Sequence, residues 1–446
     1  MFAFVDGAFA LGWLWCEPGR GLGACRHALE PGALPVLTRR VLGRGALLVA
    51  LLVAIPLVAP VPVAHADQVR DRQYWIADYG IDRAWGVTRG AGVRIAIIDT
   101  GIDGSHQDLL GAVVAGTDVS GLGSADGQTP LGSDRRHGTM VASLAAGRGN
   151  NGTDGVIGSA PEAQLLSVSM TFSGGDVSPD DQIAQAVRWA VDNGADVISL
   201  SLTRNTRDWP ESWDRAFSYA AANDVVVVAA AGNRGSGTVA VGAPATMPGV
   251  LTVGGVTREG LASDTASSQG ITIGVMAPGE GLVGAVPGGN YVSWSGTSGA
   301  TPIVAGIVAL VRAAYPNLDA ANVINRVLVT ARPASDTRPD PLYGYGLVDA
   351  HAAVTAEVPL VSANPLGSID DWIVLHRRQE GNPIVVPLGP SGTSVDEQAE
   401  PVMAEPVAAG TQLDIAPYAI TGLFGLGFLV VLTSGLVLVL QRPRNR

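Results

Sequence analysis

The sequence contains very little cysteine. It has 446 residues and only two cysteines, Cys16 and Cys25, which both precede its first long apolar segment. The rest of the chain therefore has no disulfide, no cysteine-ligated metal site and no cysteine nucleophile. Positive charge is also scarce, because 28 Lys and Arg stand against 40 Asp and Glu, giving a formal net charge of −12. A nucleic-acid-binding protein needs a basic surface, so we expect no nucleic-acid partner.

Glycine is abundant, at 58 residues, and much of it lies in short turn-like clusters between apolar runs. Strand-like runs at 93–98, 195–202 and 224–231 alternate with helical stretches at 181–193 and 212–223. This alternation predicts an α/β fold with a mostly parallel sheet covered on both faces. Functional residues of such sheets gather at the carboxyl ends of the strands. Asp99 and the pair Gly232–Asn233 follow strand-like runs and are candidates for such positions.

The first apolar segment, residues 46–63, has the features of a secretory signal peptide. Arg39, Arg40 and Arg44 precede it, and the small-residue site Ala64-His65-Ala66 follows it. A basic region, an apolar region and an A-x-A site predict export with cleavage after Ala66. The alternative is an uncleaved anchor. Residues 1–35 fit no signal-peptide pattern, and we hypothesise that translation starts near position 36.

A second apolar segment lies near the end of the chain, at residues 415–440. It is uncharged over more than about 20 residues, a length that crosses a bilayer. Arg442, Arg444 and Arg446 follow it, and positive charge marks the cytoplasmic side of a membrane. Together with the signal peptide, this predicts a single-pass cell-membrane protein whose main domain lies outside the cytoplasm. The alternative interpretation of this segment is a buried core helix.

These segments divide the chain into five predicted parts. Residues 1–66 form an N-terminal extension and signal peptide, 67–357 the main α/β domain, 358–414 a stalk, 415–440 a transmembrane helix and 441–446 a cytoplasmic tail. The stalk is rich in Pro, Gly, Ser and acidic residues, and such a composition is typical of a flexible linker. Within it, residues 372–375 and 384–388 are predicted to be strand-like.

Three local motifs carry Asp, His and Ser in that order, at 97–103, 137–142 and 295–302. Each motif alone has an ordinary interpretation. Asp99 would end a strand, His137 would be structural, and Ser298 would cap a helix. Their joint occurrence favours a catalytic triad instead, because a serine hydroxyl needs a base and an imidazole base needs a carboxylate.

The chemistry of a triad explains these residue types. A serine hydroxyl is a weak nucleophile, so Ser298 needs an imidazole to accept its proton. We expect His137 to be that base and Asp99 to fix the tautomer and stabilise the charge of His137. Ser298 precedes an apolar helical run at 303–314, and the N-terminus of a helix offers N–H groups to a developing oxyanion. Gly296 and Gly299 leave space for a substrate.

The motifs and their order resemble the subtilisin family of serine proteases over residues 73–356. The order Asp, His, Ser differs from that of chymotrypsin-like enzymes and α/β-hydrolases. The resemblance implies that Asn233, in the run Ala230-Ala231-Gly232-Asn233, donates to the oxyanion. It also implies that the strand binding the substrate backbone consists of Ser199, Leu200, Ser201 and Leu202, with Gly232 nearby. Residues 277–279 and 344–350 are family-like too.

The chain departs from the family pattern at two positions. Gly299 follows the nucleophile where a larger residue, often Met, is usual, and Thr203 follows Leu202 where Gly is common. Catalysis of this kind needs no cofactor. Structural calcium is common in the family, and Asp108 with the 150–154 loop is the place where it would bind. Ordinary polar turns explain the same residues, so the metal content is left open.

The arrangement of the chain resembles the mycosins, the subtilases of type VII secretion systems. Both combine a signal peptide, a short leader, the protease domain, a Pro-rich stalk and one C-terminal anchor. The leader is short because Tyr74-Trp75-Ile76 already resembles the start of a mature subtilase domain, which leaves no room for a folding propeptide. The absence of cysteine from the protease domain departs from the mycosin pattern.

The sequence therefore predicts a membrane-anchored serine endopeptidase that cleaves exported proteins or peptides. A type VII secretion membrane complex is the expected partner. One alternative is a scaffold subunit that stabilises such a complex, with proteolysis secondary. Another is a protease that matures leader peptides. The complete set of Asp99, His137, Asn233 and Ser298 favours activity, because a scaffold has no chemical need for all four.

Overall fold

The computed structural model describes residues 68–150, 154–377 and 402–403. The predicted signal peptide, the apolar segment 415–440 and the tail 441–446 lie outside these residues. The described strands are β1 (Arg94–Asp99), β2 (Val113–Asp118), β3 (Arg148–Asn150), β4 (Asp154–Ile157), β5 (Gln164–Ser169), β6 (Val197–Leu200), β7 (Leu202–Thr203), β8 (Val226–Ala230), β9 (Leu251–Val256), β10 (Ile273–Pro278), β11 (Leu282–Val286), β12 (Asn290–Trp294) and β13 (Val402–Met403).

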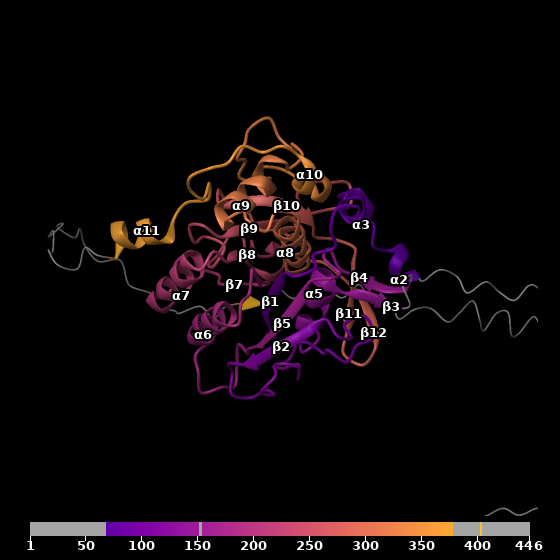
Figure 1. Cartoon of the computed structure of the whole chain (residues 1–446). Helices are drawn as coiled ribbons and strands as arrows, with labels where there is room; N and C mark the ends of the chain where they lie inside the picture. The colour runs from indigo at the N-terminus through magenta and orange to yellow at the C-terminus, as the bar shows by residue number, and fades with distance from the viewer. Residues whose placement is uncertain (1–67, 151–153, 378–401, 404–446) are drawn as a thin grey trace, which may run out of the picture. The chain divides into compact units, whose positions relative to one another are not determined.

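Seven of these strands form the central sheet, in the order β10-β9-β8-β6-β1-β5-β2 (Figure 1). Every neighbouring pair in it is parallel, which confirms the predicted sheet type. β1 lies between β5 and β6. Ile98 is opposite Leu200, and Leu200 is opposite Ala229, so the carboxyl ends of β1, β6 and β8 are aligned. The residues that follow these strands therefore meet at one edge of the sheet.

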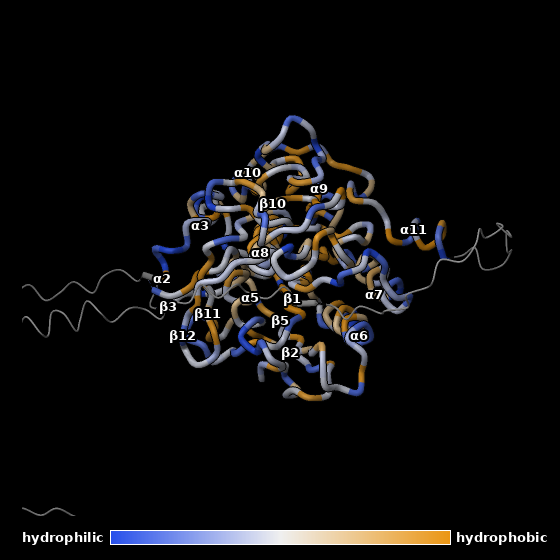
Figure 2. The backbone as a smooth tube through the Cα atoms, turned by 180° about the vertical axis from the view of Figure 1, so that it is seen from behind, coloured by the Kyte–Doolittle hydropathy of each residue, from blue (hydrophilic) through white to orange (hydrophobic). Residues whose placement is uncertain are grey.

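The central strands are buried on both faces. All residues of β6, β8 and β9 are buried, and only the first residue of β1 is exposed. Their sequences are nearly continuous runs of Val, Ile, Leu and Ala, as expected for parallel strands covered by helices. Figure 2 shows the same distribution, with hydrophobic residues along the tube inside the domain and hydrophilic residues in the outer loops.

The helices cover the two faces of the sheet. They are α2 (Gln68–Asp71), α3 (Trp75–Asp78), α4 (Ile81–Ala84), α5 (His137–Ala146), α6 (Pro179–Asp192), α7 (Glu211–Ala222), α8 (Thr297–Ala314), α9 (Ala320–Val329), α10 (Ala350–Thr355) and α11 (Ile369–His376), with a 3-10 turn at Arg234–Ser236. Figure 1 shows α5 and α8 on one side of the sheet and α6 and α7 on the other. The predicted helices at 181–193, 212–223 and 303–314 are confirmed within a few residues, except that α8 begins earlier, at Thr297.

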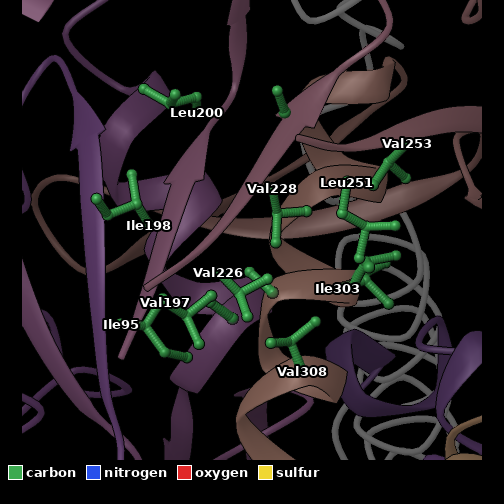
Figure 3. Packing of buried hydrophobic residues seen from close by; sticks show 14 of the residues in the cluster. Ile95, Val197, Ile198, Leu200, Val226, Val228, Leu251, Val253, Ile303 and Val308 are labelled. Carbon is green, nitrogen blue, oxygen red and sulfur yellow. The ribbon is translucent and has the colours of Figure 1, made fainter. Parts of the chain in front are cut away.

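Helix α8 forms the centre of the hydrophobic core. Its Ile303 and Val308 lie against strand residues such as Val226 and Leu251 (Figure 3). With 18 residues and a mostly apolar composition, α8 is long enough to cross a membrane, but 89% of it is buried inside the domain. It is therefore a core helix, and it is distinct from the predicted anchor at 415–440.

The segment that begins the described chain is part of the domain. Gln73 exchanges two hydrogen bonds with Ile157: its Nε2 donates to the backbone oxygen at 2.8 Å, and its Oε1 accepts from the backbone N–H at 2.9 Å. The Tyr74 hydroxyl donates to the Glu280 carbonyl at 2.8 Å. These contacts agree with the expectation that residues 74–76 already belong to the protease domain.

The predicted strand at 372–375 is wrong, because these residues lie in helix α11. Ser368 caps this helix by accepting from the backbone N–H of Asp371, and two acidic residues occupy the first turn. A capping serine followed by acidic residues stabilises a helix N-terminus, and the sequence analysis overlooked this signal. The other predicted strand-like run, 384–388, lies outside the described residues.

The body of the domain also extends beyond residue 357, where the stalk was predicted to begin. Asn322 and Asn325 donate to the carbonyl oxygens of Val361 and Pro359, both at 3.1 Å. Ile369 is buried. The chain therefore packs against the domain as far as Arg377, because side chains of distant helices satisfy its backbone.

Candidate active site

Asp99 and His137 meet at the carboxyl edge of the sheet. Asp99 is the last residue of β1, and His137 is the first residue of α5. Nδ1 of His137 lies 2.9 Å from both carboxylate oxygens of Asp99, and both side chains are buried. A proton on Nδ1 that is donated to Asp99 leaves Nε2 as the acceptor of the imidazole. This tautomer is the one that a general base requires.

A close approach of two backbones holds this pair. The backbone N–H of Gly138 donates to the Thr100 hydroxyl at 3.0 Å. A Cβ atom at Gly138 would lie 2.3 Å from the carbonyl oxygen of Gly101, closer than any side chain tolerates. The glycine after His137 therefore allows the start of α5 to lie directly on the turn that follows β1.

Ser298 is the second residue of α8 and is fixed through Ser201. Its hydroxyl donates to the Ser201 carbonyl at 3.3 Å, and its own carbonyl accepts from the Ser201 hydroxyl at 2.9 Å. The second bond has a clear cause. In a regular helix the N–H of residue 302 would bond the Ser298 carbonyl, but Pro302 has no N–H. The Ser201 hydroxyl supplies the missing donor.

Gly296 and Gly299 lie on either side of Ser298 for different reasons. Gly296 has φ 149° at the start of α8, a conformation that L side chains rarely adopt. Gly299 is helical, and a Cβ atom there would lie 2.2 Å from Cδ1 of Leu282 and 3.2 Å from the Trp294 ring. Leu282 and Trp294 thus fill the space that a larger residue would occupy after Ser298.

Asn233 lies beside the turn that carries Ser298, in an orientation set by Thr297. Its Oδ1 accepts from the Thr297 backbone N–H at 2.8 Å and from the Thr297 hydroxyl at 2.9 Å. Both partners are donors, so they identify the oxygen and leave Nδ2 as the donor of the amide. A Cβ atom at Gly296 would lie 3.1 Å from this nitrogen. The amide N–H groups are therefore next to the turn that carries Ser298.

The arrangement can perform acyl transfer. It combines a hydroxyl at a helix N-terminus, an imidazole with its acceptor nitrogen set by a carboxylate, and an oriented amide donor for an oxyanion. The model of the subtilase family matches residues 90–346, more than half of the chain. The chain belongs to the subtilase family. It is accordingly a subtilisin-type serine endopeptidase.

Individual relatives agree with this assignment. Subtilisin DY of Bacillus licheniformis is 36% identical over 298 residues, which cover 66% of this chain and 97% of that protein. Mycosin-4 of Mycobacterium tuberculosis is 36% identical over 331 residues, covering 64% of this chain and 70% of that protein. The structure of MycP3 protease from the type VII (ESX-3) secretion system aligns with a TM-score of 0.54 at 32% identity, covering 64% of this chain and 88% of that one. This subtilase is mycosin-like.

The residues predicted to bind the substrate backbone fall into two groups in this subtilase. Ser199 and Leu200 lie inside β6, which pairs on both sides with β1 and β8. Leu202 belongs to β7, which lies outside the seven-stranded sheet, and Ser201 joins the two strands. Of β6 and β7, therefore, β7 is the strand with a backbone edge outside the central sheet that can pair with a peptide. Gly232 follows β8, and its N–H donates to the Thr297 hydroxyl at 3.2 Å.

Asp108, the candidate calcium ligand, has protein partners. It accepts from the Val156 N–H at 2.7 Å and from the Tyr291 hydroxyl at 3.2 Å, and burial raises the pKa of its carboxyl group. The Arg70 guanidinium donates to the carbonyl oxygens of Asp154 at 2.9 Å and of Gly155 at 3.0 Å. Across 68–150 and 154–377, no three His, Asp or Glu side chains group as metal ligands. The structure leaves the calcium site untested, because residues 151–153 of the loop lie outside the described ranges.

Two residues that position the site were not among the residues predicted from the sequence. Thr297 orients Asn233, and Pro302 leaves the Ser298 carbonyl to Ser201. Both lie within the motif 295–302, so the sequence shows the residues themselves but not their roles. Their roles depend on contacts across about 65 to 100 positions of sequence, and such contacts leave no local pattern.

Proposed function

We propose that Asp99, His137 and Ser298 form the catalytic triad of this endopeptidase, with Asn233 in the oxyanion hole. Ser298 Oγ attacks the peptide carbonyl carbon while His137 Nε2 takes the hydroxyl proton. Asp99 holds the tautomer and stabilises the imidazolium. His137 then protonates the leaving amine, and water hydrolyses the acyl-enzyme. The observation that carries this proposal is the contact of Nδ1 with both carboxylate oxygens at 2.9 Å.

The oxyanion of the tetrahedral intermediate would receive hydrogen bonds from Nδ2 of Asn233 and from backbone N–H groups at the start of α8. The role of Thr297 in fixing the Asn233 amide supports this assignment, because a preorganised donor loses little freedom during the reaction. The proposed substrate strand is Ser201–Thr203, preceded by Ser199 and Leu200 in the sheet and flanked by Gly232.

Labelling of the full-length, detergent-solubilised protein with a fluorophosphonate tests the nucleophile. We expect the wild-type protein to be labelled and Ser298→Ala to be unlabelled. Ser295→Ala, in the same loop, is the matched control and should label like the wild type. Equal labelling of Ser298→Ala would refute the assignment.

We also propose that the protease is anchored in the cell membrane, faces away from the cytoplasm and works with a type VII secretion complex. The predicted signal peptide and the apolar segment 415–440 support the topology. The similarity to Mycosin-4 and to the MycP3 protease supports the secretion role.

The absence of cysteine after Cys25 makes the topology easy to test. In intact cells, a membrane-impermeant maleimide should label Ser391→Cys and should leave Arg444→Cys unlabelled. The reverse pattern would contradict the topology.

The role as a scaffold is the second candidate, and the same catalytic variant separates the two. In a strain lacking the gene, we compare wild type, Ser298→Ala and an empty vector. If proteolysis is the main role, Ser298→Ala fails to restore processing of exported proteins. If scaffolding is the main role, Ser298→Ala restores secretion and the amount of membrane complex on a native gel.

A further inference from the structure

A short strand from the C-terminal part of the chain pairs with β7. In this antiparallel pair, Val402 of β13 is opposite Thr203, and Met403 is opposite Leu202. Figure 1 shows β13 as a short yellow arrow beside β7. Residues about 200 positions apart in sequence thus form a two-stranded sheet of their own.

The partner strand β7 leads directly away from the nucleophile. Ser201 precedes it, and the Ser201 carbonyl accepts from Ser298 Oγ at 3.3 Å. β7 belongs to no larger sheet, so its edge offers N–H and C=O groups to an extended peptide. β13 occupies the edge that the proposed function assigns to substrate.

The direction of β13 is that of a substrate. Because the pairing is antiparallel, the chain runs from the level of Thr203 to the level of Leu202, and so toward Ser201 and Ser298. A peptide that approaches the nucleophile in this direction presents the residues on the amino side of its scissile bond. The reverse direction would have suggested an incidental contact.

The surrounding sequence suits such an occupant. Pro401 and Pro406 enclose the four residues 402–405. Proline donates no ladder hydrogen bond. Pro401 and Pro406 therefore limit how far a pairing with β7 can extend on either side of these four residues.

The connection within one chain compensates for the small size of this contact. Arg377, the last described residue before β13, is held to the domain by hydrogen bonds to Asp214 and to the Trp209 carbonyl, both at 2.8 Å. Residues 378–401 reach at most about 80 Å when fully extended. A tether of this kind gives an effective concentration of about 1 mM, enough for a pairing that would be negligible between separate molecules.

We propose that Val402–Met403 is a competitor in cis that occupies the substrate edge of β7 and must leave before an exported protein is cleaved. This inference rests on the proposed role of β7 and goes beyond it, because it assigns an occupant and a form of control.

Kinetics of the full-length protein in detergent micelles test the proposal. The variant Val402→Pro/Met403→Pro removes both N–H groups of β13, and Ala408→Pro/Ala409→Pro is the matched control. With a fluorogenic tetrapeptide amide, we expect the KM of the first variant to fall about three- to tenfold at constant kcat. A competing segment at an effective concentration of about 1 mM raises the apparent KM according to the ratio of that concentration to its own dissociation constant, and the variant removes this competition. The control should match the wild type. An unchanged KM for the first variant would overturn the proposal.

Fluorophosphonate labelling separates this failure from a failure of the catalytic assignment. If KM is unchanged while Ser298 still labels, the competitor is wrong and the protease assignment stands. If Ser298 fails to label in every protein, the proposed function fails and the competitor fails with it.

A cross-link tests the pairing without any measurement of activity. Residues directly opposite in an antiparallel pair have Cα atoms about 4.5–5.5 Å apart, within the range of a disulfide. We expect Thr203→Cys/Val402→Cys to form an intramolecular disulfide under copper–phenanthroline, at a yield that does not change on tenfold dilution. Thr203→Cys/Ala408→Cys is the control. Equal yields in the two proteins would overturn the pairing.

Discussion

The proposed catalytic edge of the sheet, which carries Asp99, His137 and Ser298, and the C-terminal segment 358–377 are held in the structure by different means. At this edge, glycines allow close approach: Gly138 lies against the backbone of Gly101, and Gly299 lies under the side chains of Leu282 and Trp294. In the C-terminal segment, separate side chains such as Asn322, Asn325 and Arg377 bridge to backbone carbonyls or carboxylates.

This difference teaches where sensitivity to substitution should lie. Close backbone contacts leave no freedom, so a small change at the catalytic edge should alter the chemistry by large factors. Bridging side chains can be removed one at a time, so a change in the C-terminal segment should cost a little stability and leave the chemistry unaffected. Four predictions test this contrast.

The largest expected effect is on kcat when the carboxylate beside His137 is removed. Asp99→Asn should lower kcat about 10⁴-fold, because the amide no longer selects the tautomer with its acceptor at Nε2. Steady-state hydrolysis of a peptide substrate measures this. Asp103→Asn, in the same loop, is the matched control and should stay within a few-fold of the wild type. A loss below tenfold for Asp99→Asn would remove Asp99 from the mechanism.

The next effect concerns the oxyanion donor. In subtilisin, loss of one such donor lowers kcat about 10²–10³-fold, and we expect the same for Asn233→Ala with KM nearly unchanged. Thr297→Val keeps the Asn233 amide but removes one of the two donors that orient it. It should therefore lower kcat less, by about tenfold. If Thr297→Val is as severe as Asn233→Ala, Thr297 has a role beyond orientation.

The third prediction concerns the free energy of unfolding and tests the link between Ser201 and Pro302. Ser201→Ala leaves the buried Ser298 carbonyl without its donor and should lower the free energy of unfolding by about 1–3 kcal/mol. Pro302→Ala restores a backbone N–H at the right helical position. In the Pro302→Ala background, Ser201→Ala should therefore cost much less. Urea denaturation of the four proteins gives the coupling, and an equal cost in both backgrounds would disprove the explanation.

The smallest effect is expected in the C-terminal segment. Arg377 donates to Asp214 and to the Trp209 carbonyl, so Arg377→Ala should lower the free energy of unfolding by about 1–2 kcal/mol. kcat should stay as in the wild type. Arg83→Ala, at an exposed arginine of α4, is the control and should change stability less. A large fall in kcat for Arg377→Ala would break the contrast between the two regions.

The sequence alone was sufficient for the fold class, the family and the candidate catalytic residues. Parallel strands buried on both faces need continuous apolar runs, and these are readable without coordinates. The order Asp99, His137, Ser298 indicated the family. The residue types indicated a triad, because the chemistry of such a triad restricts which residues can serve in it. The helix α11 and the packing of residues 358–377 against the domain were not predicted, because contacts with distant helices outweigh a polar, linker-like composition.

Only the tertiary structure decided how these residues work together. It set the contact of His137 with both oxygens of Asp99, the orientation of Asn233 by Thr297, and the replacement of a helical hydrogen bond by Ser201. It also brought β13 to the edge of β7. Local patterns in the sequence determine where strands and helices form, since these depend on neighbours along the chain. The residue types that carry the chemistry are read directly from the sequence. Contacts between residues up to about 200 positions apart depend on how the elements pack, and only the folded chain reveals them.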